Sequence, residues 1–388
     1  MSAAPHRVIV GGGCAGPFGR HAAATLADLA RPVVANALRA AGLEPRDVEA
    51  AFVGNAFGGV LQNQESILGQ VLLAPAGVAG VPVHTIKNAC SSGADAVHLA
   101  WSAVAYGQYD CVLVLGAEKL NLPEKARAFS ALASATDHPP AGEGRSVFMD
   151  INAERTRRYM ERYGAEPRHF ALAAAKNRRH AALNPNAALR EPATAEAILA
   201  DKIVVAPLTR GMCGGLTDGA AAVVLVSEDF ARRRGVAGPR IAASAVVSGI
   251  DGNGAASATA RAGAAAFEQA ALPPGGVSLA EVHDPTSPQE LFDIEELGLA
   301  PPGGAIALTE SGATALGGRL PVNVSGGLVA RGHPVGATGV AQIAEIAEQL
   351  MGRAGARQVA GAKAGLAQMA GGLLGRDSAV AAVHILVR

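Results

Sequence analysis

The order of predicted strands and helices in the first part of the chain returns in the second part. A helix over residues 24–41 is followed by a strand over residues 48–54, and a helix over residues 260–271 is followed by a strand over residues 279–283. Two further pairs of segments match in the same order. The run into Cys90 and the helix that follows it correspond to residues 321–351, and the apolar run over residues 110–116 corresponds to residues 379–387. A repeat of this kind predicts two similar α/β halves packed against each other.

We expect these halves to divide into residues 1–238 and residues 239–388. The first half also holds a stretch of different character, at about residues 120–205, which begins as a polar segment broken by prolines. A long irregular connection inside a compact fold is typical of an insertion that covers a functional site. We therefore predict an insertion here rather than a separate domain.

The composition favours a large buried interior. Of the 388 residues, 49% are hydrophobic and 17% are charged, and residues 110–116 form an almost entirely apolar run, as in strands covered on both faces. A chain with so little charge is expected to bury further surface between subunits. The 33 basic residues equal the 33 acidic ones, so no net charge favours nucleic acid or an anionic membrane as a partner.

Four cysteines, Cys14, Cys90, Cys111 and Cys213, lie far apart and show no metal-ligand spacing. Such isolated cysteines are typical of reduced thiols in a cytoplasmic protein, and we expect no metal site. The chain shows no secretory signal pattern at its N-terminus and no apolar run long enough to span a bilayer. We therefore expect a cytoplasmic location.

The segment Gly11-Gly12-Gly13-Cys14-Ala15-Gly16 has the GxGxxG spacing of dinucleotide-binding turns. Pro17 and Gly19 follow at the point where the phosphate-binding helix should begin. Without that helix N-terminus the phosphates lack their binding groups, so we reject a dinucleotide site.

Cys90 lies in the turn Asn88-Ala89-Cys90-Ser91-Ser92-Gly93, between a predicted strand over residues 81–86 and a predicted buried helix over residues 94–106. A cysteine at the start of a helix is close to unpaired N–H groups, which favour a thiolate over a thiol. Free cysteine is also a common small core residue. The position favours a nucleophile over a small core residue, and other motifs in the chain are needed to distinguish the two.

A second turn, Gly332-His333-Pro334-Val335-Gly336, precedes the corresponding helix of the second half. Together with the Cys90 turn it resembles the thiolase superfamily, closest to the sterol-carrier-protein type and the archaeal thiolases. The resemblance implies a five-layer αβαβα sandwich of two βαβαβαββ halves and a homodimer or tetramer. It also implies an acyltransferase that uses acyl-CoA substrates and keeps no permanently bound cofactor.

The resemblance implies roles for particular residues. Cys90 carries the acyl group as a thioester, His333 activates it, and His283 polarises the thioester oxygen of the second substrate. Catalysis of this kind also needs N–H donors for the developing oxyanion. We expect these from Cys90 itself and from the C-terminal loop near Leu374. Asn323 and Gly332 are further positioning candidates.

The segment His283-Asp284-Pro285-Thr286 departs from the family pattern, because Pro285 stands where a second catalytic cysteine is expected. No cysteine follows Cys213 in the chain, so the alternative C-terminal position lacks one too. Three explanations stay open. His283 is the base, another cysteine approaches, or no α-proton is removed because the reaction is decarboxylative condensation or simple acyl transfer, as in the β-ketoacyl synthases, which have a Cys-His-His site.

Two questions about partners also stay open. Relatives of this type often pair with a small zinc-ribbon/OB-fold protein, so the chain is either active alone or active only with such a partner. The predicted helix over residues 152–163 carries Arg155, Arg157 and Arg158. These arginines either contact the phosphates of coenzyme A or are solvated helix charges, the more common case.

Overall fold

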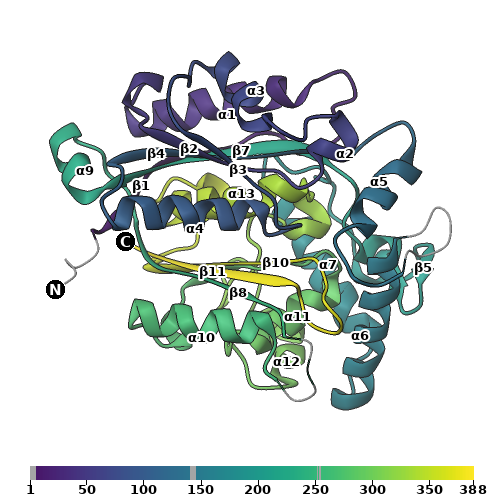
Figure 1. The fold of residues 1–388 in the computed structure, drawn as a ribbon. Helices are drawn as coiled ribbons and strands as arrows, with labels where there is room; N and C mark the ends of the chain where they lie inside the picture. The colour runs from purple at the N-terminus through teal and green to yellow at the C-terminus, as the bar shows by residue number, and fades with distance from the viewer. Residues whose placement is uncertain (1–5, 140–145, 251, 253–254) are drawn as a thin grey trace.

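The computed structural model describes residues 6–139, 146–250, 252 and 255–388. In it the chain forms five layers, with helices outside and between two sheets (Figure 1). The hydrogen-bonded strand order is β3-β2-β4-β7-β1 for the first sheet and β8-β11-β10-β9 for the second, joined by a short β1–β8 pairing. The strands are β1 (Val8–Ala15), β2 (Ala50–Gly54), β3 (Val83–Ile86), β4 (Cys111–Lys119), β7 (Asp218–Ser227), β8 (Arg240–Ser248), β9 (Leu279–Glu281), β10 (Ala364–Gly371) and β11 (Val380–Val387).

The two sheets repeat the same pairing pattern. In the first, β2 is parallel to β3 and β4, while β7 is antiparallel to β4 and β1. In the second, β9 is parallel to β10, while β11 is antiparallel to β10 and β8. Residues 321–324, at the start of the segment that corresponds to the run into Cys90, form only a single bridge, from Val322 to Ala280. They lie next to β9, where β3 lies next to β2 in the first sheet. The predicted five-layer α/β fold is confirmed, whereas the division at residue 238 stays a prediction.

Helices α4 (Ser92–Ala105) and α13 (Val335–Leu350) form the central layer between the sheets (Figure 1). Both are apolar on nearly every side, as a helix enclosed by two sheets must be. They pack closely at their N-terminal ends, because Gly339 leaves room for the backbone of Ala94: a Cβ on Gly339 would lie 2.5 Å from the Ala94 nitrogen. This approach brings together the turns that precede the two helices.

Outer helices cover the other face of each sheet (Figure 1). Those on the first sheet are α1 (Leu26–Ala41) and α3 (Leu68–Leu73), and those on the second are α10 (Ala258–Ala270), α11 (Ser287–Glu296) and α12 (Gly304–Glu310). The connection between β4 and β7, which includes the stretch predicted as an insertion at about residues 120–205, contains α5 (Lys125–Ala133), α6 (Val147–Tyr163), α7 (Pro167–Ala182), α8 (Ala195–Leu199) and the short strands β5 (Ile203–Val205) and β6 (Leu208–Thr209). The remaining short helices are α2 (Gly58–Gln62) and α9 (Glu228–Arg234). No helix in the described ranges is both long and apolar enough to cross a bilayer.

The glycine-rich segment at the start of the chain lies in a strand. Residues 11–15 belong to β1, which pairs with β7, and the next helix begins only at Leu26. No helix therefore begins directly after these glycines in the described part of the chain, as the phosphate-binding turn would require. Strand β10 has no counterpart in the sequence-based expectations, since its Ala-Gly-Leu-Ala-Gln-Met-Ala-Gly sequence lacks β-branched residues and becomes a strand only through its partners β9 and β11.

Candidate active site

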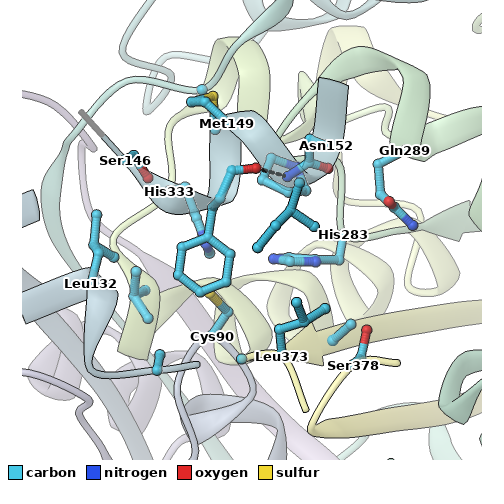
Figure 2. Close-up of a pocket in the computed structure, with 18 of the residues that line it drawn as sticks. Cys90, Leu132, Ser146, Met149, Asn152, His283, Gln289, His333, Leu373 and Ser378 are labelled. Atoms are coloured by element: carbon cyan, nitrogen blue, oxygen red, sulfur yellow. Dashed lines mark hydrogen bonds between the residues drawn. The ribbon is translucent and has the colours of Figure 1, made fainter. Parts of the chain in front are cut away.

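A cavity of about 130 Å³ opens where the two central turns meet the insertion. Its walls are mainly apolar and include Phe57, Leu120, Leu132, Met149, Val335 and Leu373. Figure 2 shows Cys90, His283 and His333 at the cavity, with Met149 and Asn152 of α6 entering from the opposite side of the view. The predicted insertion thus contributes one wall of the site.

The turn that carries Cys90 is held by its own side chains. Ala89 adopts a left-handed conformation with φ of 48°. Ser92 accepts a 2.8 Å hydrogen bond from the Asn88 N–H and donates to the Ala89 carbonyl at 2.7 Å. Asp95, one turn into α4, accepts from the Ser91 hydroxyl at 3.0 Å and from the Asn88 amide. These bonds present the Cys90 side chain to the cavity without engaging its sulfur.

Burial raises the pKa of the Cys90 thiol to about 12, and the nearby Glu118 carboxylate adds to the rise. The N–H groups of Gly372 and of Cys90 itself lower the pKa but do not compensate. The shift is therefore opposite to the sequence-based expectation, because the loss of hydration outweighs the helix N-terminus. Near pH 7 the thiol needs a base to become a nucleophile.

His333 is oriented by two threonines. Its backbone N–H donates to Thr217 Oγ1 at 2.7 Å, and its Nδ1 lies 2.8 Å from Thr338 Oγ1. The Thr338 hydroxyl donates its single proton to the Pro334 carbonyl at 3.0 Å, so it accepts from the imidazole. We therefore assign the Nδ1–H tautomer, with a free electron pair on Nε2. Burial, together with the charges of His283 and Arg331, holds the pKa of His333 well below its ordinary value.

His283 follows β9 and enters the same cavity. Its backbone N–H donates to Gln368 Oε1 at 2.8 Å. Its ring meets that of His333 edge to face, with centroids 5.3 Å apart. Burial, with a smaller contribution from Arg155, lowers the pKa of His283 to about 3, so this imidazole is also neutral.

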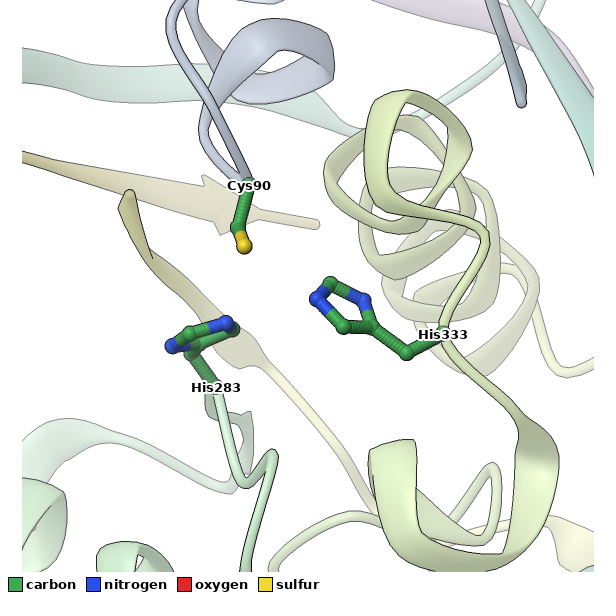
Figure 3. A group of neighbouring side chains, drawn as sticks. All are labelled: Cys90, His283 and His333. Carbon is green, nitrogen blue, oxygen red and sulfur yellow. The ribbon is translucent and has the colours of Figure 1, made fainter. Parts of the chain in front are cut away.

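The three side chains converge from three distant segments (Figure 3). Cys90 Sγ and one ring nitrogen from each histidine all lie within 4.8 Å of one another. The Nε2 atoms of both histidines are buried and make no hydrogen bond. A thiol beside two neutral imidazoles, each with an Nε2 atom free of hydrogen bonds, is suited to proton transfer and to hydrogen bonding with a carbonyl oxygen.

Glu118, at the end of β4, connects the loop after β2 with the start of α13 and was not identified from the sequence. Its fully buried carboxylate accepts the N–H of Gly336 in α13 at 3.1 Å and those of Ala56 and Phe57 at 2.8 and 3.2 Å. The Asn55 side chain donates a fourth bond at 3.0 Å. Burial outweighs these donors and raises the pKa of Glu118 to about 7. No local motif marks this residue, because its partners come from other parts of the chain.

The three predicted positioning residues lie in different surroundings. Gly332 adopts φ of 107°, a conformation that suits glycine, and delivers His333 to its contacts. Asn323 is fully buried. Its side-chain oxygen accepts a hydrogen bond from the Val282 N–H at 2.8 Å, and its side-chain NH₂ donates to Glu290 Oε2 at 2.9 Å. Its amide is therefore engaged within the protein, away from the residues that line the cavity.

The oxyanion donor expected in the loop near Leu374 stays a prediction, and the structure places Leu374 itself in a turn. Its N–H donates to the Asp377 carbonyl at 3.0 Å in a tight turn, and its side chain is exposed. Gly372, two residues earlier in the same loop, has the N–H close to Cys90 Sγ. Within this loop Gly372 is therefore the better candidate donor, and its position depends on how β10 and β11 pair.

No second thiol lines the cavity among the residues that the structure describes. Pro285 occupies the wall at the position where the family pattern has a cysteine. Cys213 is the nearest in sequence to a lining segment, but its thiol donates to the Thr209 carbonyl at 3.3 Å. Cys111 is buried in β4, and Cys14 lies in β1. These contacts favour structural roles for the other three cysteines.

Comparison with known proteins gives a consistent family. The model described as "Thiolase, N-terminal domain" matches residues 8–192, and that described as "Thiolase C-terminal domain-like" matches residues 251–386. The chain is 36% identical over 364 residues to an acetyl-CoA acetyltransferase of Methanothermobacter thermautotrophicus, covering 91% of this chain and 92% of that protein.

Two further similarities agree. Sterol carrier protein 2 of Gallus gallus is 33% identical over 357 residues, covering 87% of this chain but only 64% of that longer protein. Among solved structures, the "Ltp2-ChsH2(DUF35) aldolase" superposes with a TM-score of 0.80 at 25% identity, covering 99% of this chain and 98% of that one. The chain therefore belongs to the thiolase superfamily and is an acyltransferase that acts on acyl-CoA thioesters.

Proposed function

We propose that the chain forms an acyl thioester on Cys90 and then makes or cleaves a carbon–carbon bond next to a CoA thioester. The observation that carries this proposal is the convergence of Cys90, His283 and His333, with their reactive atoms within 4.8 Å in an apolar cavity. Its relatives include an acetyl-CoA acetyltransferase, which is consistent with 3-ketoacyl-CoA thiolysis or Claisen condensation. Coenzyme A thioesters are substrates here, and the proposal requires no bound cofactor.

In the first step, His333 Nε2 accepts the Cys90 proton as the sulfur attacks the carbonyl of the acyl-CoA. The N–H groups of Cys90 and Gly372 bind the resulting oxyanion. The bond between the acyl carbon and the CoA sulfur then breaks, and the CoA thiolate takes the proton from His333. The products are acyl-Cys90 and free coenzyme A. A neutral imidazole suits this exchange, because it can accept the proton and return it.

In the second step, His283 donates from Nε2 to the thioester oxygen of the second acyl-CoA. This bond stabilises the enolate that attacks acyl-Cys90. In a condensation without decarboxylation a base must remove the α-proton, and we assign this role to a histidine of the pair, because no other described side chain in the cavity wall is a suitable base.

A second candidate is decarboxylative condensation, which Pro285 and the absence of a second thiol in the described wall favour. The bond between the α-carbon and the carboxylate of a malonyl unit breaks, and its electron pair forms the enolate while carbon dioxide leaves. The enolate carbon attacks acyl-Cys90, and the released thiolate takes up one proton. No α-proton has to be removed.

A parallel assay tests the proposal and separates its two forms. Acetoacetyl-CoA with coenzyme A is compared with malonyl-CoA plus a short acyl-CoA, and the acyl mass on the Cys90 peptide is followed in each. Thiolysis to acetyl-CoA supports the first form, whereas carbon dioxide release supports the second. If no acyl-CoA leaves a mass on Cys90, the nucleophile assignment fails.

A further proposal concerns a partner protein. The name of the structural neighbour joins two proteins, Ltp2 and ChsH2(DUF35). We infer that this chain works with a zinc-ribbon/OB-fold partner. Co-expression with the candidate partner should yield a stable complex with a higher turnover than the chain alone. Equal turnover with and without the partner would contradict the inference.

We also propose a cytoplasmic homodimer or tetramer. Strand β3 is the edge of the first sheet and has an unpaired side. Nearby in the chain, Val60 is 61% exposed and Ile67 is 56% exposed, which is unfavourable for a free surface. Light scattering after size-exclusion chromatography should give at least twice the chain mass. A monomer at micromolar concentration would contradict this proposal.

A further inference from the structure

One permanently charged side chain lines the cavity that holds Cys90. Arg155, on α6, is the only arginine, lysine, aspartate or glutamate among the described residues of the cavity wall. The other polar members outside the catalytic trio, such as Asn152 and Gln289, are neutral. A cation in a largely apolar wall is costly unless it has a partner, so its presence there needs an explanation.

The protein satisfies Arg155 only in part. One terminal nitrogen, Nη2, lies 3.4 Å from Glu296 Oε1, a long contact, and the guanidinium stacks over Phe292 at 5.7 Å from the ring centroid. Glu296 also accepts a 2.7 Å bond from Ser257, so its carboxylate is shared. The Arg155 side chain is 27% exposed. A guanidinium carries five N–H donors, so most of them are left for a ligand.

The neighbouring arginines differ. Arg157 donates to the Ala206 carbonyl at 2.6 Å on the protein surface. Arg158 pairs with Glu154, one helical turn away, and is half exposed. Neither lines the cavity of Cys90. Arg155 is therefore distinguished by its position rather than by the general charge of its helix.

Arg155 lines the same cavity as Cys90 and His283. It also lines a second pocket, which contains the two residues that its guanidinium contacts, Phe292 and Glu296. The phosphates of coenzyme A are separated from the thioester by the whole pantetheine arm. An anion that reaches Arg155 from inside the Cys90 cavity, while the thioester is at Cys90, therefore belongs to the acyl part of the substrate.

We propose that Arg155 binds a carboxylate carried by the acyl group, so that the site prefers dicarboxylyl-CoA thioesters to neutral acyl-CoA thioesters of the same length. This inference rests on the proposed formation of acyl-Cys90. A guanidinium matches a carboxylate with two parallel hydrogen bonds, which gives both affinity and orientation. The apolar side chains of the cavity contact the methylene groups between the two ends.

Two matched pairs of substrates test the inference: glutaryl-CoA with pentanoyl-CoA, and adipyl-CoA with hexanoyl-CoA. The rate of acyl-Cys90 formation is measured by intact mass for the wild type, Arg155→Gln, Arg155→Lys and the control Arg158→Gln. We expect Arg155→Gln to slow the dicarboxylyl substrates by about ten- to a hundredfold, as for loss of a charged hydrogen bond, and the neutral ones by less than about threefold. Arg155→Lys should be intermediate, and Arg158→Gln unchanged.

The outcomes separate the two proposals. If neutral chains acylate Cys90 as fast as dicarboxylyl chains and Arg155→Gln changes neither, the inference is overturned while the acyl-Cys90 proposal stands. If Arg155→Gln slows both classes equally, Arg155 contacts a common part such as coenzyme A, which also overturns it. If no acyl-CoA acylates Cys90 in the wild type, both proposals fail. Unchanged thermal unfolding of Arg155→Lys shows that the fold tolerates changes at this position.

Discussion

The turns before the two central helices carry the proposed nucleophile and the proposed base, and they hold these side chains in opposite ways. In the turn before α4, the side chains of Ser92 and Asp95 hold the backbone around Cys90. Backbone N–H groups lie near its sulfur, and a ring nitrogen of each histidine lies within 4.8 Å of it. In the turn before α13, the imidazole of His333 is itself anchored by Thr338. One turn positions a backbone, and the other positions a side-chain ring.

This difference follows from the chemistry of the two groups. A thiol must form and break a covalent bond, so it is useful when nothing competes for its sulfur. An imidazole must present one chosen nitrogen, so its other nitrogen needs a fixed partner. The pKa of Cys90 is about 12 and both histidines are neutral. In the proposed mechanism Cys90 therefore gives its proton to His333 only when substrate binds and the sulfur attacks.

The largest expected effect comes from removing the uncommitted sulfur. Cys90→Ser should lower turnover by about 10⁴-fold or more, because a hydroxyl is a much weaker nucleophile than a thiol with the same base. The measurement is steady-state transfer with the best acyl-CoA. Cys213→Ser is the matched control and should retain activity within about twofold, since its thiol lies outside the cavity wall. A large loss in the control would place Cys213 in the reaction.

Removing the anchored base comes next. His333→Ala should slow acylation of Cys90 by about a thousandfold, the usual range for loss of a general base. Stopped-flow release of coenzyme A measures this step separately from the later one. His283→Ala should leave acylation largely intact and slow only the carbon–carbon step. Equal losses of acylation in the two variants would contradict the division of roles.

Glu118 connects the loop after β2 with the start of α13, and its replacement tests that connection through pH. Its pKa of about 7 in the folded protein lies above the ordinary value of 4.5. Between pH 4.5 and pH 7, the carboxyl group therefore keeps its proton in the folded state and has lost it in the unfolded state. Its stabilising contribution is complete below about pH 4.5 and is lost as the pH rises through about 7. The free energy of unfolding of the wild type, relative to Glu118→Gln, should therefore fall by about 3 kcal/mol from acid to neutral pH. Urea unfolding of both proteins measures this difference, and a pH-independent difference would contradict it.

The smallest expected effect concerns the anchor of the base. Thr338→Val keeps the volume but removes the acceptor of the His333 Nδ1–H, and should lower turnover by about tenfold, the cost of one hydrogen bond. Thr338→Ser restores the hydroxyl and should recover most of the activity. Nitrogen-15 chemical shifts of His333 report the tautomer directly. An unchanged Nδ1–H tautomer in Thr338→Val would show that Thr338 does not select it.

Local patterns were sufficient to identify the two turns and the order of elements. The strand-turn-helix pattern around Cys90 and the glycines around His333 are short-range signals, and a helix that is apolar on nearly every side has to lie inside the protein. The same approach missed β10 and could place the predicted loop donor only near Leu374, whereas Gly372 is the residue whose N–H lies near the Cys90 sulfur. Those features depend on pairing with β9 and β11, which are distant in the chain.

The sequence by itself determined the α/β class, the repeated order of elements and Cys90 as a candidate nucleophile, because residue type and spacing carry that information locally. His283 and His333 became candidates through the resemblance to the thiolase superfamily. The tertiary structure alone decided their chemical state. The pKa of Cys90, the tautomer of His333, the role of Glu118 and the place of Arg155 in the cavity wall arise from burial and from contacts between distant segments. Desolvation and long-range hydrogen bonds depend on three-dimensional packing, which no local spacing records.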